Sequence, residues 1–122
     1  MIIREARRAG VRSVVVTHAM LAPVHMSLAQ MKEAAAMGAW IEFVYNALIG
    51  AGKEFEFADY ARAIREIGPE HCILSSDLGQ AGNPLHPDGL AAFFAGLKAA
   101  GVPDAQIKLM SPTNPAKALG MD

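Results

Sequence analysis

The sequence is short of cysteine and of net charge, and each shortage narrows what the protein can be. A single cysteine, Cys72, excludes a disulfide within the chain and is typical of a reducing compartment, so we expect a cytoplasmic protein. Eleven basic and twelve acidic residues leave a formal charge of −1, which offers no attraction for nucleic acid or an anionic membrane. No apolar run approaches the roughly 20 residues that span a bilayer. We therefore expect neither partner.

What the chain does contain is apolar material in a repeating order. Hydrophobic residues make up 52% of its 122 residues, enough for the core of one domain, and we expect residues 1–122 to form a single domain. Three apolar runs read as buried strands, at 13–17, 40–45 and 72–76. Each is followed by a loop and a helical pattern, as repeated parallel βα units require. The pattern predicts an α/β fold with a parallel sheet.

The helix boundaries rest on local signals. Ser27 and Gln30 form a capping-box pattern that predicts a helix from 28 to Gly38, and further helices are expected at about 57–67 and from Pro87 onward. Residues 2–9 have the pattern of a truncated amphipathic helix that leads directly into a buried strand. This pattern predicts that Met1 is an internal start within a longer fold. The tail predicts two short helices, the second with Asn114 as its N-cap.

Polar residues follow the predicted strands directly. His18 ends the first run, Asn46 the second and Asp77 the third. Ligands of parallel α/β proteins bind at the carboxyl ends of the strands, so these side chains are expected at one rim. Asp77 is the strongest candidate for a metal ligand or general base, the alternative being a residue that only turns the chain. His18 is a candidate metal ligand, the alternative being a structural histidine.

Three further residues belong to the predicted rim. Glu42 interrupts an apolar strand, where a buried unpaired carboxylate would cost several kcal/mol. It is therefore expected to be compensated inside a site, unless its strand is a solvated edge. His25 and His86 lie in loops after strands and are candidates for binding a substrate carboxylate or phosphate, or a metal, although such histidines are often only solvated. Asn46 is a further candidate for binding the substrate.

The pattern resembles the carboxyl-terminal part of metal-dependent hydrolases of the amidohydrolase superfamily, in an uncharacterised cytosolic branch. The resemblance covers nearly the whole chain. It rests on four motifs, Val-Val-Val-Thr-His18-Ala, Met37-Gly-Ala-Trp-Ile-Glu42, Ile73-Leu-Ser-Ser-Asp77-Leu-Gly-Gln and Asn114-Pro-Ala-Lys-Ala-Leu-Gly120.

The resemblance implies a partial TIM barrel of about three strands, corresponding to strands six to eight, with flanking helices. It implies a divalent metal, zinc with manganese or iron as alternatives, bound by His18 and Asp77. Asp77 would also accept a proton from the attacking water, with Glu42 assisting in catalysis. The superfamily's ligands from earlier strands have no counterpart here, and a complete barrel needs about 250 residues.

Two functions remain open from the sequence. The first is metal-dependent hydrolysis of an amide, ester or related bond in a small-molecule substrate, or a decarboxylation, with the rest of the site supplied from elsewhere. The second is a non-catalytic, self-associating remnant of the barrel. Exposed strand edges favour a homo-oligomer in either case. A receiver-type domain is disfavoured, because the first strand ends in Thr17 and His18 rather than in acidic residues.

Overall fold

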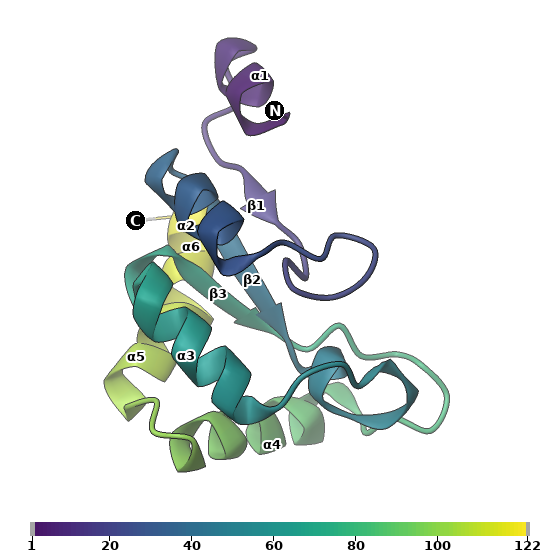
Figure 1. Ribbon diagram of the computed structural model, residues 1–122. Helices are drawn as coiled ribbons and strands as arrows, with labels where there is room; N and C mark the ends of the chain where they lie inside the picture. Colours follow the sequence, from purple (N-terminus) through teal and green to yellow (C-terminus); the bar gives the residue numbers. More distant parts are fainter. Residues whose placement is uncertain (1, 122) are drawn as a thin grey trace.

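The computed structural model describes residues 2–121 and contains a small, open parallel sheet with helices on both sides (Figure 1). The strands are β1 (Val15–Val16), β2 (Trp40–Val44) and β3 (Cys72–Ser75), in the order β1-β2-β3. Both neighbouring pairs are parallel, with Val15 opposite Trp40. The predicted α/β class with a parallel sheet is confirmed.

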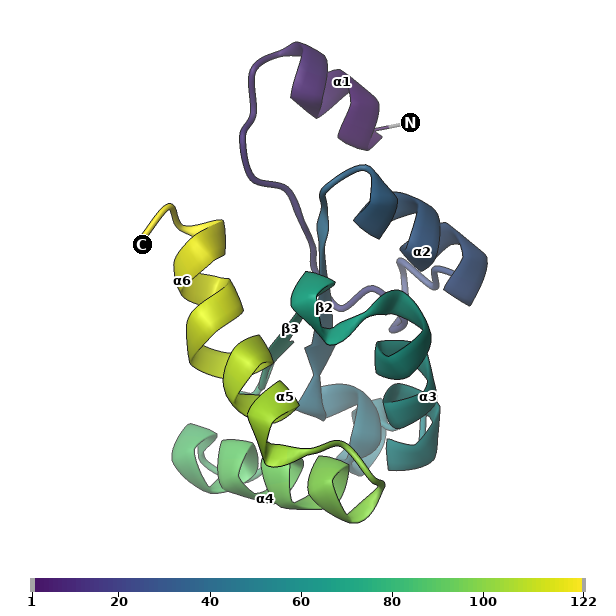
Figure 2. The same cartoon turned by 90° about the vertical axis from the view of Figure 1, so that its left-hand side faces the viewer.

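Each strand is followed by a helical segment, as predicted. α2 and α3 contact each other on one side of the strands, while α5 and α6 lie on the other side (Figure 2). Strands that follow chain order, with crossover helices on one face, differ from a doubly wound sheet, whose strand order reverses. The helical elements are α1 (Ile2–Arg8), α2 (Leu28–Ala36), η1 (Tyr45–Leu48), η2 (Gly50–Gly52), α3 (Phe57–Ile67), η3 (Pro69–His71), α4 (His86–Ala99), α5 (Asp104–Lys108), the π-helical turn η4 (Leu109–Thr113) and α6 (Asn114–Ala118).

Two local predictions are confirmed in detail. The Ser27 hydroxyl accepts a hydrogen bond from the Gln30 backbone N–H, and the Gln30 side chain accepts one from the Ser27 backbone N–H, so the capping box starts α2. α3 begins and ends where the apolar stripe of residues 57–67 predicts, and its buried residues include Tyr60 and Ile64.

The predicted N-cap role of Asn114 is wrong. Asn114 has helical backbone angles, because α5, η4 and α6 form one continuous helical run. Its buried side chain donates to the carbonyl oxygens of Pro69 (2.8 Å) and Cys72 (2.7 Å) at the start of β3. Asn114 therefore joins the tail to the sheet, since buried carbonyl groups without partners are costly.

The core between β2, α3 and α4 is aromatic. Phe93 of α4 is fully buried and stacks on Tyr45, with ring centroids 5.4 Å apart. Tyr60 of α3 packs edge-on against Phe43 of β2 at 4.9 Å and donates its hydroxyl to the Val44 carbonyl at 3.0 Å. Burial raises the pKa of Tyr60 well above its usual value. This packing holds the carboxyl end of β2 against both helices.

The edge of the sheet formed by β1 has no neighbouring strand among residues 2–121. The strand expected over 13–17 is reduced to two residues, because β1 pairs only with β2. Val15 is 42% exposed, and α1 projects from the body at the top of Figure 1. Within residues 2–121, no helix is both long enough and apolar enough to cross a membrane.

Replacing Phe93 by alanine should remove about 4 kcal/mol from the free energy of unfolding, because the ring is fully buried among other aromatic rings. Urea denaturation measures this loss. Phe94→Ala is the matched control and should cost less, since Phe94 is only partly buried. Equal losses for the two variants would contradict the packing described.

Cys72 should resist alkylation in the native protein. Burial raises the pKa of its thiol to about 12, so only about one molecule in ten thousand carries a thiolate at a pH near 8. Iodoacetamide labelling followed by mass spectrometry should give no adduct until urea is added, whereas Leu85→Cys, at a 76% exposed position, should provide an immediately labelled site. Rapid native labelling of Cys72 would contradict this.

Candidate functional site

The carboxyl ends of the three strands form one polar rim. His18, Asn46 and Asp77 follow β1, β2 and β3 in that order. Because the strands are parallel, all three residues lie at the carboxyl ends of the strands. His18 and Asp77 have left-handed backbone angles, with φ of 33° and 50°. Such angles are uncommon outside glycine and concentrate at functional sites. The predicted placement of these residues at one rim agrees with the sheet.

Glu42 lies at the centre of the rim and is bound on both sides. Its Oε2 accepts the backbone N–H of His18 at 3.1 Å, and its Oε1 accepts the Ser75 hydroxyl at 2.9 Å. One carboxylate on the middle strand thus joins the ends of β1 and β3. The solvated-edge alternative for Glu42 is wrong, because β2 is the central strand and Glu42 is half-buried.

Asp77 is held by an amide network from two loops. Asn46 Nδ2 donates to Asp77 Oδ2 at 3.4 Å, and Asn83 Nδ2 donates to Asn46 Oδ1 at 3.1 Å. The Gln80 side chain donates to the Asp77 carbonyl at 2.9 Å. Asn46 is buried, whereas the Asp77 side chain is exposed. The Asp77 carboxylate is therefore oriented by the buried Asn46 side chain and remains accessible to solvent.

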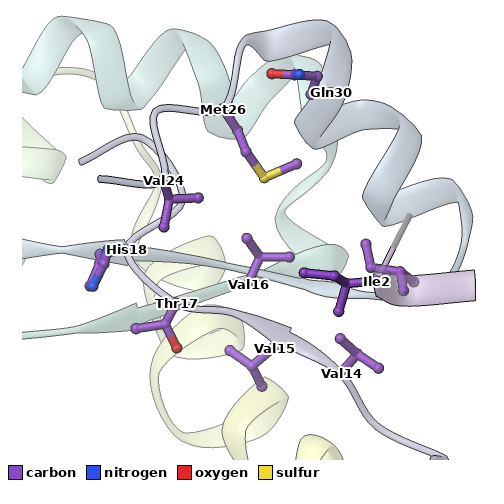
Figure 3. Close-up of a pocket in the computed structure, with 10 residues that line it drawn as sticks. Ile2, Val14, Val15, Val16, Thr17, His18, Val24, Met26 and Gln30 are labelled. Carbon is purple, nitrogen blue, oxygen red and sulfur yellow. The ribbon is translucent and has the colours of Figure 1, made fainter. Parts of the chain in front are cut away.

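His18 has one ring nitrogen without a partner. Its Nδ1 is buried and makes no hydrogen bond within residues 2–121. Figure 3 shows His18 beyond Thr17, at the end of the row of valines that forms β1. A buried ring nitrogen without a hydrogen-bond partner lowers the stability of the fold, and a catalytic role or a bound ion is one explanation for such an atom. His18 thus has a ring nitrogen that no residue within 2–121 uses.

The other two candidate site histidines, His25 and His86, have partners away from His18. His86 was expected in the loop but is the first residue of α4, and its Nδ1 lies 2.6 Å from the buried Ser76 hydroxyl. His25 Nε2 lies 2.7 Å from Glu54 Oε2, which links the loop after β1 to the segment before α3. In each histidine this contact occupies one ring nitrogen and leaves the other for a substrate contact.

The rim does not assemble a complete metal centre by itself. Among residues 2–121, no three His, Cys, Asp or Glu side chains form a group that could hold a metal ion. His18 and Asp77 are separated by β2, and both oxygens of Glu42 are already hydrogen-bonded. The described donors thus fit part of a site, one imidazole and one carboxylate, rather than the three protein ligands of a hydrolytic zinc centre.

Several residues that shape the rim were not predicted as site residues. Ser75 and Ser76 were expected only as the last residues of the third strand, yet one binds Glu42 and the other binds His86. Asn83 stood out only as part of a glycine-rich loop. The register explains the Ser75 contact, because Ser75 lies opposite Val44 and so shares the side of the sheet on which Glu42 lies.

Glu42→Ala should lower the free energy of unfolding by about 2 kcal/mol, because it leaves the His18 N–H and the Ser75 hydroxyl without an acceptor. Urea denaturation at neutral pH measures the change. Glu33→Ala is the matched control and should stay within about 0.5 kcal/mol of the parent, since Glu33 forms only an exposed ion pair with Arg4. A stabilised Glu42→Ala variant would show that desolvation of the carboxylate outweighs its hydrogen bonds.

Comparison with known proteins identifies one partial match. Residues 1–42 match the model of DUF6282, a family of unknown function. The matched segment runs from α1 to Glu42 in β2 and does not include Asp77. No curated protein and no solved structure matches the chain. The function is therefore inferred from the geometry of the rim.

Proposed function

We propose that the chain is the carboxyl-terminal part of a barrel of the amidohydrolase type and contributes half of a metal-dependent hydrolytic site. The arrangement of the fold supports this. Three parallel strands in chain order, with α2 and α3 on one face, correspond to consecutive βα units of a barrel. On the other side of the sheet, where α5 and α6 also lie, the Ser75 hydroxyl and the Glu42 carboxylate meet near the polar rim (Figure 2).

The observation that carries the proposal is that an imidazole nitrogen without a partner and an oriented, exposed carboxylate both lie at that rim. His18 Nδ1 has no partner, and Asp77 is held through Oδ2 only. Imidazole and carboxylate together suit zinc, manganese or iron. The remaining ligands would come from another polypeptide segment, because a hydrolytic centre needs at least three from protein.

Each rim residue has a role in this proposal. When bound, a divalent metal supplies a water of lowered pKa. Asp77 would act as a proton acceptor through its free Oδ1, and Asn46 holds the carboxylate in place through Oδ2. Glu42 assists by fixing the backbone of His18 rather than by binding the metal, since both of its oxygens are hydrogen-bonded. The substrate would be a small molecule with an amide, ester or related bond, and decarboxylation is a possible variant.

The alternative is a non-catalytic remnant of the barrel that self-associates. One observation favours it, namely that no three-donor group exists among residues 2–121. The alternative retains the fold and the open edge of β1 but assigns the rim no chemistry. Purified protein that neither binds zinc at the rim nor hydrolyses ester or amide substrates with added zinc or manganese would support it.

Zinc affinity should fall at least tenfold in both His18→Asn and Asp77→Asn. Asparagine tolerates the left-handed backbone of both positions, so the folds should survive. Competition against a chromophoric chelator measures the affinity. Removing one of two ligands costs 1.4 kcal/mol or more, which is about tenfold.

His71→Asn is the matched control for this measurement. His71 lies in η3, directly before β3, and so at the end of the strands opposite to the rim. Its replacement should leave zinc affinity unchanged. Equal weakening by all three variants, or no effect of Asp77→Asn, would reject a metal site at the rim.

A further inference from the structure

A groove runs along the unpaired edge of β1. Its volume is about 570 Å³, and its walls come from the first turn of α1, the strand itself, the following loop and the start of α2 (Figure 3). Its lining residues are Ile2, Ile3, Val14, Val15, Val16, Thr17, His18, Val24, Met26 and Gln30. None of them is Lys, Arg, Asp or Glu. The groove is thus predominantly apolar and has no acidic, lysine or arginine side chain in its lining.

The backbone along this groove has unused hydrogen-bonding groups. Trp40 N–H donates to the Val14 carbonyl at 2.8 Å, so residues 14 and 16 direct their backbone groups toward β2. Because these groups alternate along a strand, those of Val15 and Thr17 face the free edge. Both residues are exposed. The edge also lacks proline and lysine over 13–17, which commonly protect edge strands.

We propose that a second copy of this chain occupies the groove, with the two β1 strands paired antiparallel across a twofold axis. The distribution of exposed apolar residues supports a second copy rather than an unrelated strand. Ile2, 85% exposed, and Val24, 41% exposed, lie at opposite ends of the groove (Figure 3). A twofold axis places the Ile2 end of each copy against the Val24 end of the other, so both residues are covered.

The absence of charged side chains also fits self-pairing. An isologous contact places the same surface of both copies together, so a lining of one charge sign would repel itself. The two lining surfaces here carry no such charge. The result is a continuous six-stranded sheet in which β1 is no longer an edge, since each copy contributes three strands.

The axis passes next to Val16 in this arrangement. Val15 of one copy then lies opposite Thr17 of the other, and both have backbone groups that point outward. The two such pairs form four backbone hydrogen bonds, and the Val16 residues face each other as the non-hydrogen-bonded pair, with Cα atoms about 4.5 Å apart. The dimer requires no metal at the rim. It uses the edge of β1 that a preceding strand would cover in a complete barrel, so the two arrangements exclude each other at this edge.

Light scattering coupled to size-exclusion chromatography tests the proposal on the full chain. The parent protein should show a mass of about 26 kDa, twice the 12.9 kDa of one chain, at micromolar concentration. Val15→Lys should halve that mass, because it places a charge at the centre of each edge. Leu85→Lys, which changes an exposed leucine before α4, should remain dimeric. Circular dichroism of each variant checks folding.

A cysteine cross-link provides the second measurement. Val16→Cys should form a disulfide-linked dimer on mild oxidation, because the paired Cα atoms fall within disulfide range. The native Cys72 is buried and should not interfere. Leu85→Cys should stay monomeric on a non-reducing gel. A monomeric parent protein would overturn the proposal, as would a dimer that survives Val15→Lys or one that Val16→Cys does not cross-link.

Discussion

The Glu42 carboxylate is the interaction on which the rest of the rim depends. It sits on the central strand and accepts one hydrogen bond from each neighbouring strand end, from the His18 N–H and from the Ser75 hydroxyl. Parallel strands have no hairpin to fix the relative position of their ends, so such a bridge determines how the two loops leave the sheet. The two hydrogen bonds offset the cost of removing the half-buried carboxylate from water. The carboxylate in turn fixes the positions of His18 and Ser75 at the rim.

The consequences extend along both loops. Glu42 holds His18 through the backbone N–H of His18. The imidazole ring takes no part in that hydrogen bond, and its Nδ1 has no partner among residues 2–121. Two residues beyond Ser75, Asp77 takes a left-handed backbone and presents its carboxylate to Asn46. Chemistry at this rim would therefore use His18 and Asp77, while Glu42 maintains their geometry.

Much of the fold follows from local sequence signals, whereas the parts set by tertiary partners do not. The capping box of Ser27 and the apolar stripe of 57–67 determine helix boundaries through interactions within a few residues. Asn114 looks like an N-cap in sequence but is recruited by carbonyl groups over forty residues away. β1 is shorter than its β-branched run because one of its edges has no partner.

The candidate site shows the same division. Strand-end reasoning places His18, Asn46 and Asp77 at one rim, since it needs only parallel strands. It does not reveal the bonds of Ser75 to Glu42 or of Asn83 to Asn46, which depend on register and on loop conformation. Nor can it tell whether the donors suffice for a metal, because that depends on their separation across β2.

The most direct test of the rim as a single binding site is an amide NMR spectrum recorded during zinc titration. The proposed geometry predicts that shifts and broadening concentrate on two separate stretches, at His18 and Ala19 and at residues 76–80, and that both saturate together. Perturbations centred on His71, or on the exposed pair of His25 and Glu54, would place the metal elsewhere and contradict the account.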